Sequence, residues 1–357
     1  MRSLKPHLAV GLFLVAALPA PPQLERAAED AHFGLPRIHI IGDEAYDSGR
    51  WVDLIIAADA LPDSGSPQKQ PWNAYWWPYK RGGLTRRWIS PNEPSPIEKM
   101  DLVTGHASQG LDWEIRSHPA NVDWGGQCDG YAIASVLEPE PRFPVLHDGV
   151  CFASGDVQGL LGAIYMGDMT GQRVDVLGRD AFVNARSDSD LTPALFHIAL
   201  TNVMGRLSQG LYIDIGKHGE IYNKPVASYS LKTKRIGNRL EITTTLNVVR
   251  YFTEPKVTAT DKKLVCAPMV LTYELELDNY GFIRTDRGEW TGASAGYHPS
   301  SMKIPRGSPV KLPTANPFID MDLVRTLAAR SAAATEPECL PDKMHRAPQP
   351  KVEEDPP

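Results

Sequence analysis

The sequence lacks the features that would point to a nucleic-acid, zinc or membrane protein. Its 357 residues contain 37 Lys and Arg against 43 Asp and Glu, a net charge of −6, with no basic stripe. Nucleic acid is therefore not expected as a partner. Only four cysteines are present, and none forms a Cys-x-x-Cys pair or has histidine at zinc-finger spacing, so a structural zinc site is not expected. No stretch reaches the ~18 consecutive apolar residues of a membrane-spanning helix.

The N-terminus has the order of segments found in a secretory signal peptide. Arg2 and Lys5 precede an apolar run from Leu8 to Leu18, which is followed by the small residues and prolines of "ALPAPP". This order predicts a signal peptide over residues 1–21; the run is too short for an uncleaved anchor, the alternative. No cysteine lies nearby, which excludes a lipoprotein anchor. We expect a secreted or periplasmic protein that leaves the membrane after signal cleavage.

Three regions are expected after the signal peptide. Residues 22–110 form an N-terminal arm or a pro-region, and residues 111–330 form the catalytic domain. Residues 331–357 are expected to be a disordered tail, because the last part is rich in proline and charge. Within the arm, the prolines of "PWNAYWWPYKRGG" at residues 71–83 argue against a regular helix. Its aromatic residues either pack against the core or form the wall of a substrate cleft.

Smaller signals in the arm predict short elements. "RIHIIG" at residues 37–42 is typical of a strand, and the segment from Trp51 to Leu61 of a strand or short helix. Ser95, with Glu98 three residues later, forms a capping-box pattern and predicts a helix start.

From about residue 110 the pattern predicts helices followed by strands. Helical spacing and caps predict helices from Cys128 to the prolines after residue 138, and over residues 154–167. Runs rich in β-formers predict strands in four segments: residues 194–202, 210–216, 225–252 and 264–283. Helices followed by an antiparallel sheet indicate an α+β domain.

The stretch "DWGGQCDGYAIAS", residues 123–135, places a cysteine at the start of a predicted helix. There the unpaired N–H groups and the helix dipole favour the thiolate of Cys128, which is the nucleophilic form. Gly125 and Gly126 leave its approach open, and the Cys128 N–H is placed to stabilise an oxyanion. Asp129 does not fit this interpretation, since an adjacent carboxylate raises a thiol pKa. The alternatives for Cys128 are a buried thiol or a disulfide.

A nucleophilic cysteine needs a base and a group that orients the base. Of the ten histidines, only His197 lies well inside a predicted strand, and Asp214 lies among apolar residues of the next one. Adjacent antiparallel strands can bring both to one face, where Asp214 would orient the His197 ring. The alternatives are a core histidine and an aspartate that caps a loop.

Several ordered segments resemble the transglutaminase elicitor family, known from oomycete plant pathogens and some marine bacteria. The match spans roughly residues 70–305, and Tyr222 and Lys224 stand where the family has Trp and Gln. The segments are "PWNAYWWPYK", "SPIEKMD", "GQCDGYAIASVLEPEPRFPV", "FHIALTNVMG" and "EIYNKPVASYSL".

This resemblance implies a papain-like Cys-His-Asp core that carries out acyl transfer. Cys128 would attack the γ-carboxamide of a protein glutamine, and His197 would protonate the departing nitrogen, which leaves as ammonia. The thioester would then pass to a lysine or other amine, or to water. Gln127 and Trp124 are expected at the oxyanion or cleft, although Trp124 has core packing as an alternative role. Glu220 is a second candidate for the acidic partner.

The resemblance leaves competing functions open. A papain-like cysteine peptidase, amidase or deamidase shares the same nucleophile chemistry, and a catalytically inactive secreted binding protein would keep the fold. The sequence requires no cofactor or metal and does not settle whether calcium is needed. Cys266–Cys339 is suggested as a disulfide.

Overall fold

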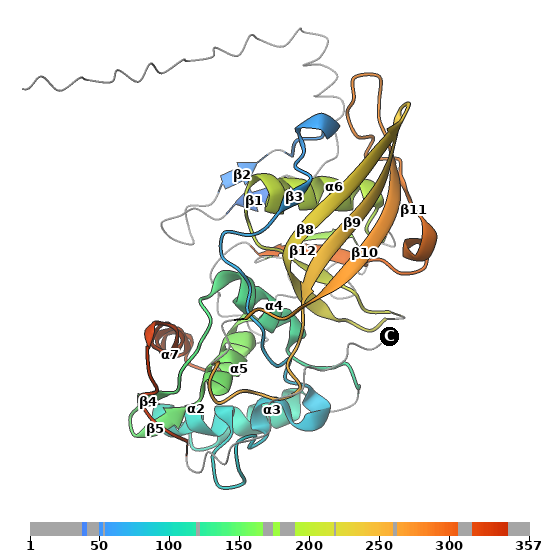
Figure 1. Ribbon diagram of the computed structural model, residues 1–357. Coiled ribbons are helices and arrows are strands. Elements are labelled where there is room, and N and C mark those ends of the chain that lie inside the picture. The colour runs from blue at the N-terminus through green and yellow to red at the C-terminus, as the bar shows by residue number, and fades with distance from the viewer. Residues whose placement is uncertain are drawn as a thin grey trace, which may run out of the picture.

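The computed structural model describes residues 38–40, 50–52, 54–118, 122–166, 174–178, 190–217, 219–259, 263–305 and 316–341. The predicted signal peptide lies outside these residues. Most of the helices occupy one end of an elongated molecule, and a large antiparallel sheet occupies the other (Figure 1). The predicted α+β fold is confirmed. Within the described ranges, no helix is long and apolar enough to cross a bilayer.

The helical end is built around two helices that are buried almost throughout. These are α4 (Cys128–Leu137) and α5 (Ser154–Tyr165), both predicted, and burial on all sides agrees with their lack of a polar face. A Cβ on Gly130 would lie 2.0 Å from the Gly162 carbonyl oxygen, so glycine permits their close approach. Around them lie α2 (Pro96–Thr104), α3 (Gln109–Ser117), α7 (Met321–Ala333) and the hairpin of β4 (Val145–His147) and β5 (Val150–Phe152).

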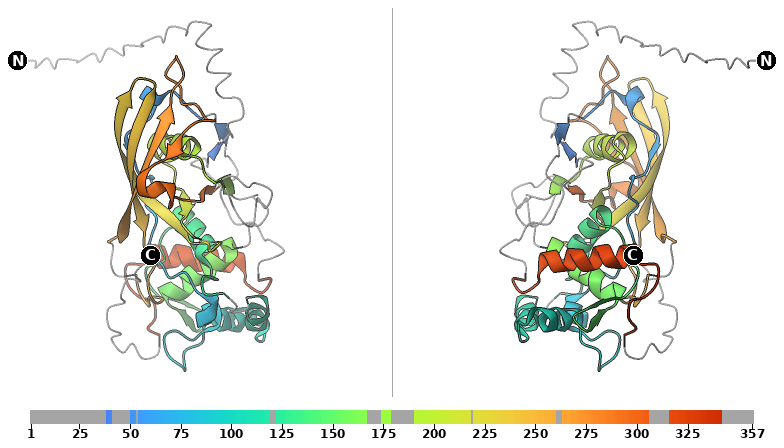
Figure 2. Two further views of the ribbon diagram at one scale, coloured as in Figure 1. Left: turned by 90° about the vertical axis from the view of Figure 1, so that its right-hand side faces the viewer. Right: turned by 90° about the vertical axis from the view of Figure 1, so that its left-hand side faces the viewer.

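The sheet has the strand order β11-β10-β9-β8-β7-β12-β6, with β3 also paired to β8. Its strands are β3 (Ser64–Gly65), β6 (Val174–Gly178), β7 (Tyr212–Asp214), β8 (Asn223–Ile236), β9 (Arg239–Val249), β10 (Cys266–Glu276), β11 (Glu289–Trp290) and β12 (Ser301–Pro305). In Figure 2 the sheet curves around α6 (Pro193–Leu200), and α4 lies between the sheet and the other helices. The N-terminal end of α4 therefore faces the ends of β7, β8 and β12.

The aromatic arm packs into the core. Trp72, Tyr75 and Trp77 are all at most 4% exposed, and Trp88 makes edge contacts with the last two. The Trp72 indole donates to a backbone carbonyl that follows α4, at 3.0 Å, and Tyr131 donates back to the Trp72 carbonyl at 2.7 Å. Of the two alternatives for these aromatic residues, the structure confirms packing against the core and not a cleft wall.

The capping box predicted for α2 is present. Ser95 Oγ accepts from the Glu98 N–H, and the Glu98 carboxylate accepts from the Ser95 N–H. Earlier in the chain, β1 (Ile38–Ile40) pairs with β2 (Arg50–Val52), and the 3₁₀-helix η1 (Ala58–Ala60) follows. The strand expected at residues 37–42 and the strand or short helix expected after residue 50 are both found.

The segment that contains His197 is a helix, and the predicted strand is wrong. Thr192 Oγ1 caps α6 by accepting from the Leu195 N–H, and Pro193 occupies the first turn, both strong helix-start features. The helix continues into a π-helical turn, η4 (Thr201–Arg206). Because α6 is buried on nearly every side, its apolar run has no amphipathic period to separate a helix from a strand.

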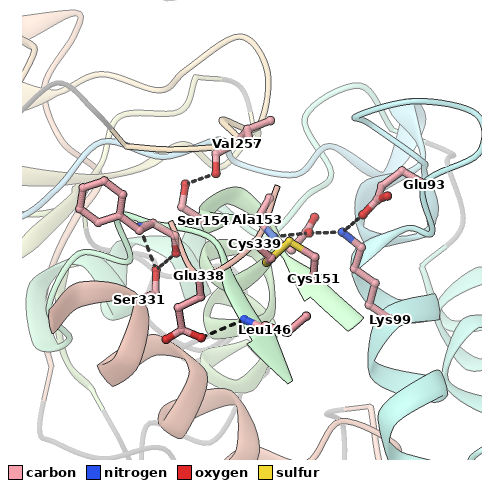
Figure 3. The surroundings of a disulfide bond; sticks show 12 residues. Glu93, Lys99, Leu146, Cys151, Ala153, Ser154, Val257, Ser331, Glu338 and Cys339 are labelled. Atoms are coloured by element: carbon pink, nitrogen blue, oxygen red, sulfur yellow. Dashed lines mark hydrogen bonds and ion pairs between the residues drawn. A yellow bond between two sulfur atoms is a disulfide. The ribbon is translucent and has the colours of Figure 1, made fainter. Parts of the chain in front are cut away.

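The disulfide joins Cys151 of β5 to Cys339, with a Cα–Cα distance of 5.9 Å (Figure 3). The suggested Cys266–Cys339 bridge is wrong, because Cys266 is a free thiol on β10. The expected tail from residue 331 is also wrong in its first part. Ser331 Oγ in α7 donates to the Phe143 carbonyl at 2.6 Å, and the disulfide holds the segment that follows; residues 342–357 lie outside the described ranges.

Candidate active site

Cys128 is the first residue of α4, as predicted, and its side chain faces the start of β8. The residue is 5% exposed. Its Sγ lies 3.7 Å from the Ile221 carbonyl oxygen and 3.8 Å from Nδ2 of Asn223, which donates to it. The thiol is thus placed among polar backbone and amide groups and makes no disulfide.

Burial raises the pKa of the Cys128 thiol to about 11. A hydrogen bond from the Asn223 backbone opposes this shift, Asp129 and Asp214 add to it, and Lys303 lowers the pKa. The helix start and the Asn223 amide favour the thiolate, but desolvation is the larger effect. Cys128 is therefore a protonated, covered thiol in this conformation.

Asp129, the residue that fits a nucleophile least well by sequence, has two partners that offset its charge. The Tyr212 hydroxyl donates to its Oδ1 at 3.0 Å, and Lys303 Nζ lies 3.2 Å from the same oxygen. The Lys303 side chain is only 7% exposed, and its charge is also close enough to lower the Cys128 pKa. Lys303 thus compensates for Asp129 beside the thiol.

Three strands align a polar row beneath the start of α4. Asn223 of β8 is opposite Asp214 of β7, which is opposite Ser301 of β12. Directly opposed residues of antiparallel strands project to the same face. The Asn223 Oδ1 and Ser301 Oγ atoms are buried, and neither has a hydrogen-bond partner among the described residues. The row therefore holds unused hydrogen-bonding capacity next to Cys128.

Asp214 organises the turn between β7 and β8 rather than a histidine ring. Its Oδ1 accepts from the N–H groups of Gly216 and Tyr222 at 2.9 and 2.8 Å. Its Oδ2 accepts from Ser300 Oγ at 3.1 Å. Burial raises the Asp214 pKa against these hydrogen bonds. The Asp214 charge raises the Cys128 pKa, but its carboxylate oxygens bind Gly216, Tyr222 and Ser300 and not the His197 ring.

His197 is not brought to Cys128, so the predicted triad is not assembled. Its Nδ1 lies 2.9 Å from the Tyr273 hydroxyl of β10, and that hydroxyl lies 2.9 Å from Thr244 Oγ1. The residue is 3% exposed, in the core between α6 and the sheet, whereas Cys128 belongs to the core of the helical end. Burial lowers the His197 pKa to about 4. His197 is a core histidine, the alternative left open by its sequence context.

The other predicted site residues have different surroundings. The Gln127 side chain is 1% exposed, and its Oε1 lies 3.3 Å from the Cβ position of Gly162 on α5, so it faces the helices. Trp124 is half-buried and packs on the helical core. Glu220 is exposed and is not a partner of His197, but it lines a pocket beside the Cys128 site.

This pocket of about 300 Å³ is lined by Ile221, whose carbonyl contacts the sulfur, but not by Cys128 itself. Its walls include Asp190, Asp214, Lys217, Glu220, Ile221, His298 and Ser300. His298 Nδ1 lies 2.8 Å from the Ser294 carbonyl, and its ring stacks on Trp290 with centroids 4.7 Å apart. In the described parts of the chain, no three His, Cys, Asp or Glu side chains are grouped as metal ligands.

Two residues of the site were missed from the sequence. Asn223 lies in "EIYNKPV", a segment noted above for its family resemblance and given no role in the site. His298 lies in "GYHPSS", outside the predicted strands. Its position just before a strand adjacent to β7 was the signal available, but the pairing of β7 with β12 spans more than 80 residues and is not readable from local pattern.

Comparison with known proteins supports the predicted resemblance. The model of the transglutaminase elicitor family matches residues 118–262, a segment that contains Cys128 and Asn223. Among solved structures, the GP42 transglutaminase from Phytophthora sojae has a similar fold, with a TM-score of 0.64 and 21% sequence identity. The likeness covers 88% of this chain and 99% of that chain. No curated protein sequence matches the chain. The resemblance to this family, predicted from the motifs, is confirmed.

Proposed function

We propose that the chain is a secreted protein-glutamine γ-glutamyltransferase that acts through a thioester on Cys128. The observation that carries the proposal is the position of the sulfur. It lies at the N-terminus of α4, and the side-chain amide of a buried asparagine, Asn223, is directed at it. A cysteine that serves only core packing has no need of N–H donors aimed at its sulfur. Donors so placed stabilise a thiolate and the oxyanion of acyl transfer.

The reaction would proceed in two acyl-transfer steps. The Cys128 thiolate attacks the γ-carbonyl carbon of a protein glutamine, and the carbonyl oxygen becomes an oxyanion. The Asn223 Nδ2–H and the Cys128 backbone N–H are the donors available to it. Collapse of this intermediate breaks the C–N bond, releases ammonia with one added proton, and leaves a thioester. A lysine ε-amine then attacks the thioester and forms an isopeptide bond, which returns the thiol.

The covered thiol corresponds to a resting state in this proposal. The Ile221 carbonyl occupies the space near Sγ that a glutamine carboxamide would take, so the substrate has to displace it. Burial meanwhile keeps the thiol protonated, which protects the nucleophile from unproductive reaction.

Export is supported by two independent features. The N-terminal sequence has the basic, apolar and small-residue order of a signal peptide. The Cys151–Cys339 disulfide is typical of proteins in oxidising compartments. Protein glutamine and a lysine or other amine would be the two substrates outside the cell or in the periplasm.

A catalytically inactive secreted binding protein is the second candidate. It is favoured by one observation, the 5% exposure of Cys128, since a covered thiol with a raised pKa is also what a structural cysteine shows. The buried, unpartnered Asn223 Oδ1 argues against it, because unused polar atoms are costly in a purely structural site.

The test is incubation of the purified protein with a glutamine-containing peptide and a labelled primary amine. We expect amine incorporation that Cys128→Ala abolishes and that Cys266→Ala, at a free thiol on β10, leaves unchanged. Ammonia release without incorporation would indicate a deamidase, and cleavage of the peptide backbone a peptidase. If none of these three products forms, the inactive binding protein becomes the better account.

A further inference from the structure

We propose that His298 is the proton-transfer residue that serves Cys128. The inference rests on the proposed function, because acyl transfer needs a group that removes the thiol proton and delivers it to departing ammonia. The residue predicted for this role, His197, is held in a different core by Tyr273.

The strand register places His298 at the same edge of the sheet as the thiol. His298 lies three residues before Ser301, the first residue of β12. Ser301 is opposite Asp214, and Asp214 is opposite Asn223, which touches the sulfur. Each step between strands is about 4.8 Å, so two steps separate the asparagine from the strand that His298 precedes.

Ile221 is the link between the two residues. It lines the same pocket as His298, and its carbonyl oxygen lies 3.7 Å from Cys128 Sγ; Cys128 itself does not line this pocket. A glutamine side chain that enters from this pocket and displaces the Ile221 carbonyl would have the sulfur on one side and the imidazole on the other. Nucleophilic attack and proton transfer to the leaving nitrogen require this arrangement.

The orientation of the His298 ring suits a proton carrier. Its Nδ1 donates to the Ser294 carbonyl at 2.8 Å, which leaves Nε2 as the basic nitrogen of the neutral ring. Stacking on Trp290, with planes 13° apart, holds the ring. Nε2 has no hydrogen-bond partner within the described ranges, and the residue is half-buried, so the nitrogen is available to substrate.

The other histidines with described side chains are committed elsewhere. His106 lies 2.9 Å from Thr104 Oγ1, His118 pairs with Glu114 on α3, and His147 belongs to the β4–β5 hairpin. None of the three lines the pocket beside Ile221. The charged groups that face His298 there are Asp190, Asp214, Lys217 and Glu220.

The proton balance is as follows. Nε2 accepts the Cys128 S–H proton as sulfur bonds to the glutamine carbon. The resulting imidazolium donates that proton to the amide nitrogen as the C–N bond breaks, and ammonia leaves. In the second half, Nε2 accepts a proton from the attacking amine and returns it to sulfur as the thioester bond breaks.

The experiment compares wild type, His298→Gln and His298→Ala, with His147→Gln as the matched control outside the site. Steady-state rates are measured on a glutamine peptide and on the 4-nitrophenyl γ-ester of the corresponding glutamate, from pH 6 to 10, with and without added imidazole. The leaving group of the ester is 4-nitrophenolate, a stable anion that departs without being protonated. We expect both His298 variants to lose roughly 10²–10⁴-fold on the carboxamide, and to lose much less on the ester at high pH. Imidazole should restore part of the rate of His298→Ala.

Three outcomes would overturn the proposal. One is an unchanged carboxamide rate and pH profile in His298→Gln, and another is an equal loss on amide and ester with no imidazole rescue, which indicates a structural role. The third is a comparable fall in His147→Gln. A wild type that hydrolyses the ester but releases no ammonia from the peptide would instead refute the glutamine specificity, while the ester and imidazole measurements still test His298.

Discussion

Replacement of Asn223 by alanine separates catalysis from stability more sharply than any other change at this site. Asn223 is 1% exposed, and its Nδ2 is the side-chain N–H donor that contacts Cys128 Sγ. Alanine removes this donor but keeps the backbone donors of residues 128 and 223. The loss of one oxyanion donor typically lowers kcat by about 10²–10³-fold, or ~3–4 kcal/mol. We expect a fall of this size in amine incorporation with little change in KM.

The free energy of unfolding of Asn223→Ala should be slightly higher than that of wild type or close to it. The Asn223 Oδ1 atom is buried without a partner among the described residues, and removal of an unsatisfied buried acceptor relieves a penalty of about 1–3 kcal/mol. This gain opposes the loss of packing contacts. Urea unfolding should therefore show Asn223→Ala to be close to wild type. The control is Asn247→Ala, an exposed asparagine on β9 whose Nδ2 donates to Ser228; its kcat should not change. A variant at residue 223 with wild-type kcat, or one that loses activity only by unfolding, would refute this role.

Two further predictions concern the disulfide and the charge beside the thiol. Cys339→Ser should lower the free energy of unfolding by about 2–5 kcal/mol, because the bond to Cys151 closes a sequence separation of 188 residues; Cys266→Ser is the control, and equal urea midpoints for the two variants would contradict the prediction. Lys303→Met should raise the pKa of Cys128 further, since the removed cation lowers it, and should shift the iodoacetamide alkylation profile to higher pH. Lys303→Arg should preserve the wild-type profile, and a shift to lower pH in Lys303→Met would show that the sign is wrong.

Local signals predicted the elements but not their contacts. The capping box at Ser95 and the helix start at Cys128 depend on neighbouring residues and are both found. The strand prediction for the segment of His197 failed because an apolar run without a period fits a buried helix and a strand equally well. Thr192 and Pro193, a cap and a first-turn proline, were the local evidence that would have decided it.

The composition of the site depends on long-range pairing that the sequence does not display. Cys128 could be identified from its helix-start context and from the family motif. Asn223 and His298 are brought near it only by the pairing of β7 with β8 and with β12. The partners of Asp129 likewise come from distant strands. Four cysteines allow several disulfide pairings, and only the fold shows that Cys151 pairs with Cys339.

The central claim is that Cys128 carries the acyl group, and intact-protein and peptide mass spectrometry after rapid acid quench tests it directly. With a glutamine peptide and no amine acceptor, we predict an adduct on Cys128 equal to the peptide mass less one ammonia. Addition of a primary amine should discharge it, and Cys128→Ala should not form it. No adduct in wild type under conditions of ammonia release, or an adduct that survives in Cys128→Ala, would contradict the account.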